Sequence, residues 1–288
     1  MDEKITLSKQ MLVIRATQSS RNPGVMKRPF SKSRFATQAA FAVMGGITLV
    51  YMVTMNTGNV NLVKAVAAFL TNIKFMFLQP TINSDLPKLL VAVAVTVSLA
   101  ILTTIMGALI AFFTGLLGAR NLSTKRRSNT IRMVMAAIRA VPTILWVLIF
   151  AINSQLGATA AIIGLNFHSI AYLTKAYSEE FEAINPGTLE ALRSTGASYW
   201  QIVFQAVLPS VIPTLLSWTF IRLEINFANA IAVGAAAGAG GIGYNLYLDG
   251  TYYFDFHAVG TIVYMLLVVI LVFEFISMRL RTHYLQKN

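Results

Sequence analysis

Residues 89–117 read LLVAVAVTVSLAILTTIMGALIAFFTGLL and contain no charged side chain. A helix needs about 20 mainly apolar residues to cross the roughly 30 Å of hydrocarbon in a bilayer, and this segment exceeds that length. A spanning strand of a β-barrel is instead a segment of about 10 residues in which apolar and polar side chains alternate. Because the apolar run here is continuous, it predicts a membrane-spanning helix that tilts or extends past the bilayer.

Similar apolar segments occur along the rest of the chain. Hydrophobic residues make up 56% of the 288 residues and charged residues 12%, whereas soluble proteins average about 25% charged residues. The expected fold class is therefore all-α: a polytopic membrane protein with about six transmembrane helices. A basic tail (1–34) is expected to precede a transmembrane domain (35–288). The other spans are expected at about 35–55, 132–152, 156–174, 211–236 and 258–278.

Between the first two expected spans, residues 62–77 carry apolar side chains at a helical period. Lys64, Asn72 and Lys74 interrupt the segment, which makes a seventh span the weaker interpretation. We expect an interfacial helix that lies on the outer face of the membrane.

The distribution of Lys and Arg predicts the orientation of the chain. If the N-terminus lies inside the cell, 18 of the 23 Lys and Arg residues fall in cytoplasmic segments. This bias is typical of cytoplasmic loops, so both termini are expected in the cytoplasm of a bacterial cell, with the protein in its inner membrane. The net charge of +12 is then explained by orientation and by attraction to anionic lipid, and nucleic acid is not an expected partner.

Motifs of common enzymes and metal sites are missing from the sequence. The chain has no cysteine, and His168, His257 and His283 are scattered. Neither H-E-x-x-H nor G-x-S-x-G occurs, so no metal site, no catalytic set and no bound cofactor are expected on this chain.

Residues 238–243 read GAGGIG and satisfy G-x-G-x-x-G. That motif binds a dinucleotide only between a strand and a helix, and here it follows an expected membrane span. The better interpretation is close backbone packing, or a break in span 211–236, at the structural glycines Gly238, Gly240, Gly241 and Gly243.

Charged and polar side chains within the expected spans are informative because charges in a membrane are costly and face a partner or a cavity. Arg139 and the group around Arg222 have two interpretations, which can coexist. One is an interhelical ion pair that holds spans 132–152 and 211–236 together, and the other is a polar lining of a substrate path. Pro142 indicates a kink or a helix start beside a cavity. The candidate path residues are Arg139, Pro142, Arg222, Glu224, Asn226 and Asn229.

The half-polar segment 178–210 lies on the cytoplasmic side in this orientation. Thr188 is expected to cap a short helix that Gly196 terminates. A second helix is expected from about Ser198 to Leu208-Pro209, with Trp200, Val203, Phe204 and Val207 on one side. From physics alone, two merely interfacial helices remain an equal alternative.

The spacing in this segment resembles the EAA loop of permease subunits in binding-protein-dependent ABC importers. That pattern is E-A-A, three residues, G, nine residues, I, one residue, then L-P. Glu190, Ala191, Gly196 and Leu208-Pro209 match it, whereas Leu192 and Ala206 replace the third alanine and the isoleucine.

The resemblance extends over about residues 86–280. The stretches RAVPTILWVLIFA (139–151), LPSVIPTLLSWTFIRLEIN (208–226) and GAGGIGYNL (238–246) are similar to phosphonate permease subunits. That branch commonly has a second arginine two residues after Asn226, where this chain has Ala228.

The resemblance implies a homodimeric permease of a type I ABC importer. A solute-binding protein would deliver a phosphonate-type anion, and separate ATPase subunits would bind ATP and Mg. The alternatives are phosphite or another small polar solute and, in a different class, an ion-coupled secondary transporter that uses Arg222 and Glu224. The residues implied to contact the ATPase are Glu190, Ala191, Thr195, Gly196, Ala197, Leu208 and Pro209.

Overall fold

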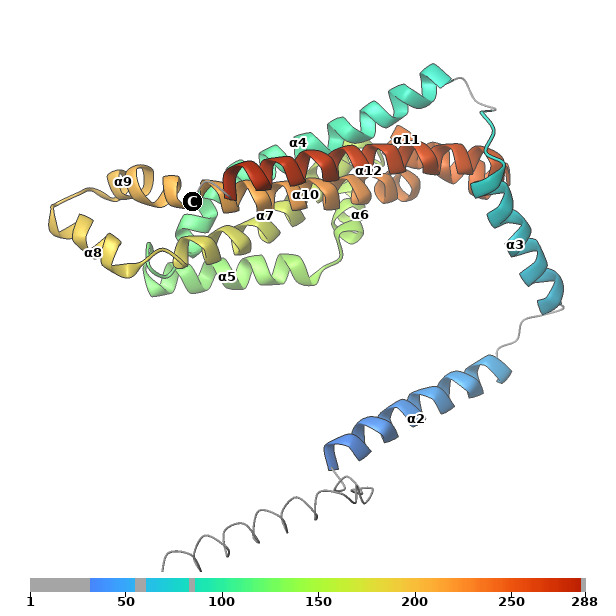
Figure 1. Ribbon diagram of the computed structural model, residues 1–288, viewed down its shortest axis with the longest axis horizontal. Coiled ribbons are helices and arrows are strands. Elements are labelled where there is room, and N and C mark those ends of the chain that lie inside the picture. Colours follow the sequence, from blue (N-terminus) through green and yellow to red (C-terminus); the bar gives the residue numbers. More distant parts are fainter. Residues whose placement is uncertain (1–31, 55–60, 83–85, 286–288) are drawn as a thin grey trace, which may run out of the picture. The chain divides into compact units, whose positions relative to one another are not determined.

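The computed structural model describes residues 32–54, 61–82 and 86–285, and over these residues the regular structure is helical throughout (Figure 1). The predicted tail 1–34 lies outside the described residues except for its last three, which begin a helix. The elements are α2 (Lys32–Thr54), α3 (Leu62–Leu78), α4 (Leu86–Gly118), α5 (Lys125–Ala140), α6 (Thr143–Ser154), α7 (Ala158–Glu182), α8 (Pro186–Ser194), α9 (Tyr199–Ile202), η1 (Val203–Val207), α10 (Leu208–Ala237), α11 (Gly241–Tyr247), η2 (Leu248–Tyr252) and α12 (Phe256–Leu285).

The chain divides into two units, Met1–Leu62 and Val63–Asn288. The described helix of the first unit, α2, is exposed along nearly its whole length, and residues 34–54 are long and apolar enough to cross a membrane. The second unit contains the remaining described helices, apart from the first residue of α3.

Within the described residues, four helical segments are long and apolar enough to span a membrane. A fifth span is formed if α5 and α6 are counted together, although they meet at a bend of 88°. The expected span 132–152 is therefore broken into two helices, and the kink or helix start predicted at Pro142 is confirmed. The cause lies at Pro142, which precedes α6, because the residue before a proline is driven out of the helical conformation.

The predicted span 156–174 lies in α7, which is not among the strongly apolar helices. Its lower hydropathy follows from its position, because α7 is enclosed by α4, α5, α6 and α10. Polar side chains such as Asn166, Ser169 and Thr174 are buried against those neighbours rather than turned to lipid. The described part of the chain therefore has four or five segments that are long and apolar enough to span a membrane. It also has one long helix, α7, that is surrounded mostly by other helices.

Small residues on α4 let α7 approach it closely. A methyl group added at Gly107 would lie 2.8 Å from the Cβ of Ser169, and one at Gly115 would lie 3.1 Å from the Cβ of Tyr177. Close backbone approach through small residues is how helices pack in membranes. Towards the α8 end of the bundle, one apolar cluster joins the ends of α4 and α7 to α8, η1 and the start of α10.

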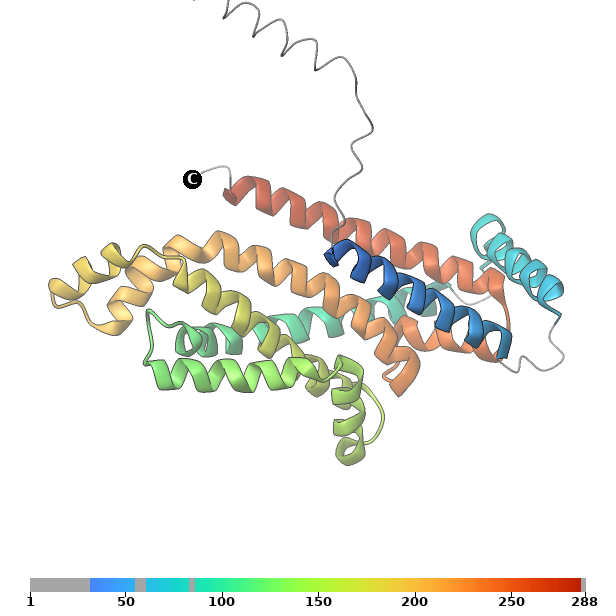
Figure 2. The same ribbon diagram turned by 90° about the horizontal axis from the view of Figure 1, so that it is seen from below.

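Different helices lie at the two ends of the bundle. α8 and α9 lie at one end, and α11 lies at the opposite end (Figure 1 and Figure 2).

The predicted helix over 62–77 is confirmed as α3, and its last turn packs on α12. There Phe75 stacks on His257 with ring centroids 4.4 Å apart, and the Tyr264 hydroxyl donates to the main-chain oxygen of Phe77 at 2.6 Å.

Candidate functional site: a coupling segment and a buried polar network

The first helix of the predicted coupling segment, residues 178–210, begins earlier than expected. Asn185 is its N-cap, because its side-chain oxygen accepts a hydrogen bond from the Gly187 amide at 2.9 Å, and Pro186 is the first helical residue. The prediction that Thr188 caps this helix was wrong. Asn and Pro are favoured at these two positions, and together they place the start three residues before Thr188.

Gly196 terminates this helix as predicted. The amide of Ala197 donates to the Leu192 oxygen at 3.2 Å, and the amide of Gly196 donates to the Arg193 oxygen at 3.0 Å. This pair of bonds is a Schellman motif, which needs a left-handed residue after the helix. Gly196 has φ of +79°, a conformation that a side chain would strain.

The second helix does not end at Leu208-Pro209. Helical structure continues from Tyr199 to Ala237, so α9, η1 and α10 form one 39-residue segment. At the junction the Leu208 amide bonds to the Val203 oxygen, five residues back, instead of four. Pro209 has no amide to donate, and its ring would clash with the carbonyl four residues earlier in a regular helix, so the wider turn accommodates it.

The predicted apolar side of this second helix divides into two. Val203 and Val207 are buried, whereas Trp200 and Phe204 are about half exposed and stack on each other at 5.8 Å. The buried pair holds the segment to the bundle, and the exposed pair leaves an aromatic surface at the end of the molecule.

α8 is held by one side and presents the other. Leu189 is 2% exposed and packs in the apolar cluster, while Glu190 and Ala191 on the same helix are exposed. The remaining predicted coupling residues follow the same division: Thr195, Gly196 and Pro209 are exposed, and Ala197 and Leu208 are half-buried.

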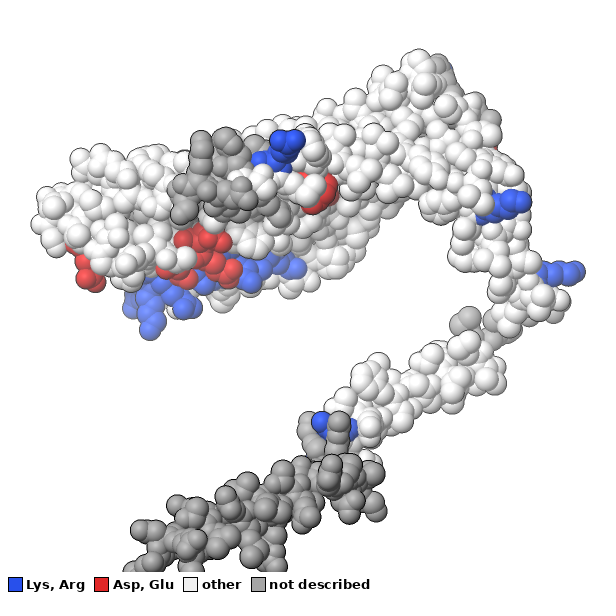
Figure 3. Space-filling view, viewed as in Figure 1, with Lys and Arg blue, Asp and Glu red and all other residues white. Residues whose placement is uncertain are grey.

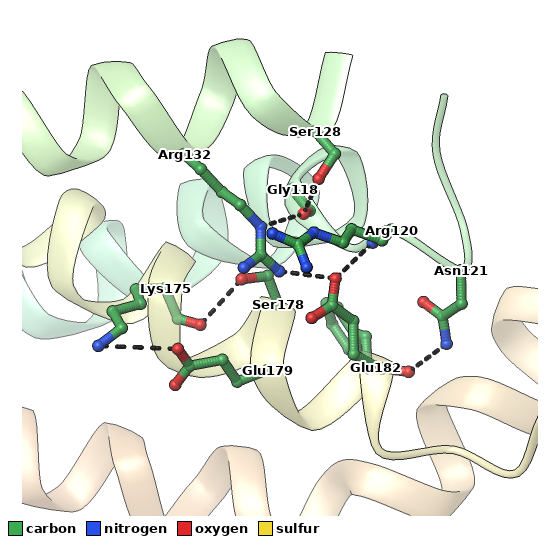
Figure 4. Close-up of polar contacts among 10 residues, drawn as sticks. Gly118, Arg120, Asn121, Ser128, Arg132, Lys175, Ser178, Glu179 and Glu182 are labelled. Atoms are coloured by element: carbon green, nitrogen blue, oxygen red, sulfur yellow. Dashed lines mark hydrogen bonds and ion pairs between the residues drawn. The ribbon is translucent and has the colours of Figure 1, made fainter. Parts of the chain in front are cut away.

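A network of charged and polar groups joins the helix ends that lie next to the coupling segment (Figure 4). Glu182, at the end of α7, forms an ion pair with Arg132 of α5 at 2.6 Å and accepts a hydrogen bond from the Arg120 amide at 2.6 Å. The Arg132 Nε and the Ser128 hydroxyl both donate to the Gly118 oxygen, at 2.9 and 2.6 Å. The ends of α4, α5 and α7 are therefore joined.

A second contact extends this network to α8. Asn121 donates from Nδ2 to the Phe181 oxygen at 2.7 Å, and its own main-chain oxygen accepts from Arg193 Nη2 at 2.8 Å. This connection was not predicted from the sequence. The signal available was the complementary charge of the arginine-rich loop 118–132 and the acidic run 179–182.

Two of the candidate path residues, Arg222 and Asn226, lie in a buried polar network between α4, α7 and α10. Asn226 accepts from the Ser169 hydroxyl at 3.0 Å and donates to the Thr104 hydroxyl at 2.8 Å. Arg222 is 1% exposed and donates from Nε to the Ser169 hydroxyl at 3.1 Å. Its guanidinium also lies 3.2 Å from a ring nitrogen of His168.

The ion pair expected between the 132–152 and 211–236 segments stays a prediction. The contacts described for Arg222 are with α7. Its guanidinium also lies over the ring of Tyr172, 5.2 Å from the centroid, in cation–π geometry. Ser169, His168 and Tyr172 were not singled out in the sequence as partners of Arg222. They occur on one face of α7 at spacings of three and four residues, which is the signal that was available.

The other candidate path residues lie at the edges of this network or away from it. Arg139 is half-buried in the last turn of α5, and its Nε donates to the Met135 oxygen at 3.3 Å. Pro142 is exposed at the start of α6, whereas Glu224 and Asn229 are half-buried on α10.

The glycine-rich stretch forms the predicted break in span 211–236. Gly238, Gly240 and Gly241 all have positive φ and connect α10 to α11. A methyl group at Gly243 would collide with the main-chain oxygen of Ile231, so α11 folds back closely on α10. The Ile242 amide donates to the Thr96 hydroxyl at 3.0 Å, which ties this turn to α4.

Metal binding finds no support in the part of the chain that the structure describes. Those residues contain no group of three or more His, Asp or Glu side chains placed to hold an ion.

Comparison with known proteins gives consistent matches. Residues 109–287 match the family described as "Binding-protein-dependent transport system inner membrane component". The phosphate-import permease protein PhnE of Mycolicibacterium smegmatis is 32% identical over 190 residues, which are 66% of this chain but 35% of that protein. The chain therefore spans about a third of the length of this relative.

Two shorter relatives are covered more completely. The putative phosphite transport system permease protein HtxC of Stutzerimonas stutzeri is 30% identical over 69% of this chain and 70% of its own length. The putative cryptic phosphonate transport system permease protein PhnE2 of Escherichia coli is 36% identical over 43% of this chain and all of its own length.

Among solved structures, an inward-facing form of the MetNI methionine ABC transporter has a similar fold. The TM-score is 0.62 at 22% identity, and the match covers 68% of this chain and 95% of that chain.

Proposed function

The chain belongs to the family of binding-protein-dependent transport system inner membrane components and is the permease subunit of such an importer, and we propose that it works as a homodimer that imports a phosphonate-type anion. It is a multi-pass membrane protein. The observation that carries the coupling part of the proposal is α8. This short helix is anchored by Leu189 and Arg193 and presents Glu190 and Ala191 outward.

ATPase subunits are the proposed binding partners of that exposed surface. ATP and Mg would be held by those subunits, and this chain would contribute no catalytic or nucleotide site of its own. α8 is suited to transmit their motion because hydrogen bonds through Arg193, Asn121 and Phe181 connect it to the loop after α4 and to the end of α7. The rigid-body rearrangement of helices is a common way to switch between two states.

The continuous helical segment from Tyr199 to Ala237 provides a second route by which motion of the ATPase subunits would be transmitted. It begins at the coupling segment and contains both Arg222 and Asn226. α7 likewise ends at the coupling segment and contains Ser169. We therefore expect a displacement of α8 and α9 to shift α7 relative to α10 where the two helices are hydrogen-bonded. Separation of α7 from α10 would expose the Arg222 guanidinium.

Substrate charge is inferred from Arg222. A guanidinium matches the oxygens of phosphate-like anions, so an uncovered Arg222 favours an anionic phosphorus compound. The relatives named for phosphate, phosphite and phosphonate transport support the same class. Ala228 provides no second arginine at its position, and phosphite is therefore the first alternative substrate.

The proposed orientation places both termini and α8 in the cytoplasm of a bacterial cell, with the protein in the inner membrane, in agreement with the bias of Lys and Arg. The opposite end, which contains α11, would then receive substrate from an extracytoplasmic solute-binding protein. An ion-coupled secondary transporter remains a different class of explanation, but it gives no role to the exposed surface of α8.

The proposal is tested by reconstitution of the chain with its ATPase and solute-binding protein in vesicles. Uptake is measured against a panel of phosphonates, phosphite and phosphate. We expect ATP-dependent uptake of one of these anions and none without the binding protein. Uptake driven by an ion gradient in the absence of ATP would contradict the proposal.

A further inference from the structure

A cavity of about 690 Å³ lies at the α8 end of the bundle. Its walls come from the end of α4, the loop before α5, and the segment from α8 to α9. Arg120, Arg127 and Arg193 are among its polar lining residues, and Phe113 and Trp200 are among its apolar lining residues. Figure 3 shows Lys and Arg gathered along α5 near this end, next to a smaller acidic group.

The three arginines line the same cavity from three different segments of the chain. Arg193 is fixed by its hydrogen bond to the Asn121 oxygen, and the main chain of Arg120 is fixed by Glu182. Arg127 lies in the first turn of α5 and is exposed. The described lining of this cavity includes no carboxylate, and Glu182 contacts the Arg120 amide beside it, so the three arginines give the cavity an excess of positive charge that favours an anion.

An apolar groove of about 530 Å³ continues from the same place. It runs between α4 and the η1–α10 segment, and its lining is aliphatic and aromatic apart from the hydroxyls of Tyr177 and Thr219. Phe113 lines both the groove and the basic cavity. The cavity and the groove therefore form one amphipathic site, with arginines at one end and apolar side chains at the other.

We propose that this site holds one anionic phospholipid of the cytoplasmic leaflet. The phosphate would lie among Arg120, Arg127 and Arg193, and an acyl chain would lie in the groove beyond Phe113. Basic pockets between spans on the cytoplasmic side are a recognised form of anionic-lipid site. Arginine also binds phosphate oxygens in a bidentate manner. The leaflet follows from the proposed orientation, whereas the lipid chemistry does not depend on transport.

Other occupants account for only part of the site. A free phosphate ion would satisfy the arginines but leave the apolar groove empty. A second copy of this chain, packed on this face about a two-fold axis, would cover the groove but would bring the same arginines and no anion. A phospholipid satisfies both ends at once, and it would contact Arg193 and Trp200, which belong to the coupling segment.

The test uses the full-length chain purified in detergent, with bound lipid counted by native mass spectrometry. Phosphatidylglycerol is compared with neutral phosphatidylcholine and with soluble glycerol phosphate, which has the same anionic group without acyl chains. We expect one phosphatidylglycerol to be retained and phosphatidylcholine to be lost. Arg127→Gln should weaken phosphatidylglycerol binding about fivefold, the effect of one cation near an anionic headgroup.

Two matched controls separate this site from general attraction. Arg126→Gln removes the same charge one residue away, outside the cavity lining, and should leave binding unchanged. Leu109→Trp fills the groove and should weaken binding, whereas Leu102→Trp, on α4 but outside the groove, should not.

Several results would overturn the proposal. Equal retention of both lipids would do so, as would equal effects of Arg126→Gln and Arg127→Gln. Full displacement of the lipid by glycerol phosphate would identify a soluble anion as the occupant. Loss of dimer with unchanged lipid in Leu109→Trp would identify the groove as a contact between copies. Lipid is counted without ATPase or substrate, so these outcomes are distinct from a failure of transport.

Discussion

The Nε of Arg222 on α10 lies 3.1 Å from the hydroxyl of Ser169 on α7, with both residues buried in the helix bundle. The same hydroxyl also lies 3.0 Å from Asn226. A buried cation is therefore held by neutral hydrogen-bonding groups of the neighbouring helix. An anionic substrate can exchange with these partners once the helices part, and Arg222 is central to the predictions that follow.

Replacement of Arg222 should reduce transport through weakened substrate binding. A hydrogen bond to a charged group contributes roughly 1.5–3 kcal/mol, so Arg222→Gln should weaken the apparent affinity for the anion by about tenfold or more. Arg222→Lys keeps the charge but loses the forked geometry and should recover only part of the loss. Uptake in reconstituted vesicles measures both variants. Arg279→Gln, an exposed position on α12, is the matched control, and equal loss in that variant would argue against a role for Arg222 in the path.

Gly196 should be required for coupling more than for folding. A side chain at its φ of +79° costs roughly 1–2 kcal/mol, so Gly196→Leu should lower thermal stability modestly. The same side chain on the exposed surface should block ATPase docking, so that ATP hydrolysis no longer drives uptake.

Gly187→Ala is the control for the Gly196 variant, because Gly187 lies in the same helix without positive φ. It should retain coupling. Normal uptake per ATP hydrolysed in Gly196→Leu would remove the coupling role from this residue.

The Arg132–Glu182 ion pair should contribute measurably to stability because both side chains are only about a quarter exposed, at 28% and 25%. A double-mutant cycle with Arg132→Gln and Glu182→Gln should give a coupling energy of about 1 kcal/mol, within the usual range for contacting residues. The Lys175–Glu179 pair is the comparison, since it is half exposed and 3.7 Å apart. Its cycle should give about 0.3–0.5 kcal/mol. Equal coupling energies in the two cycles would show that the Arg132–Glu182 pair contributes no more to stability than an exposed ion pair.

Gly243 should tolerate no side chain. Gly243→Ala places a methyl group against the Ile231 oxygen, and overpacking of this kind costs roughly 1–3 kcal/mol. Gly250→Ala has room, with its nearest neighbour at 3.6 Å, and should have little effect. Thermal unfolding in detergent compares the two, and equal melting temperatures would contradict close packing of α11 on α10.

The sequence predicted what depends on composition and spacing. Apolar runs predicted the spans, and glycines predicted the end of α8 and the turn before α11. It did not predict the helix start at Asn185, because Thr188 offered another possible cap three residues later and the residues from Ile184 to Thr188 are also typical of a turn. Nor did it predict continuity through Leu208-Pro209, which depends on a single wide helical turn that has no sequence signature of its own.

The long-range contacts of the candidate site could not be derived from local pattern at all. Arg222 had several possible partners in the sequence, and its contact with Ser169 depends on how α7 packs between α4 and α10. The close approach at Gly107 sets that packing, since it brings α4 against the Cβ of Ser169. The roles assigned to the path and coupling residues stay predictions until they are measured.

The most direct test of the central claim is ATP hydrolysis by the reconstituted complex of this chain, its ATPase and its solute-binding protein. We expect hydrolysis to rise when the binding protein is loaded with a phosphonate or phosphite, and uptake of the same anion to rise with it. The rise in uptake should be absent in Gly196→Leu. Hydrolysis and uptake that respond to none of these anions would contradict the proposed substrate class, and uptake that persists in the absence of ATP would contradict the proposed energy source.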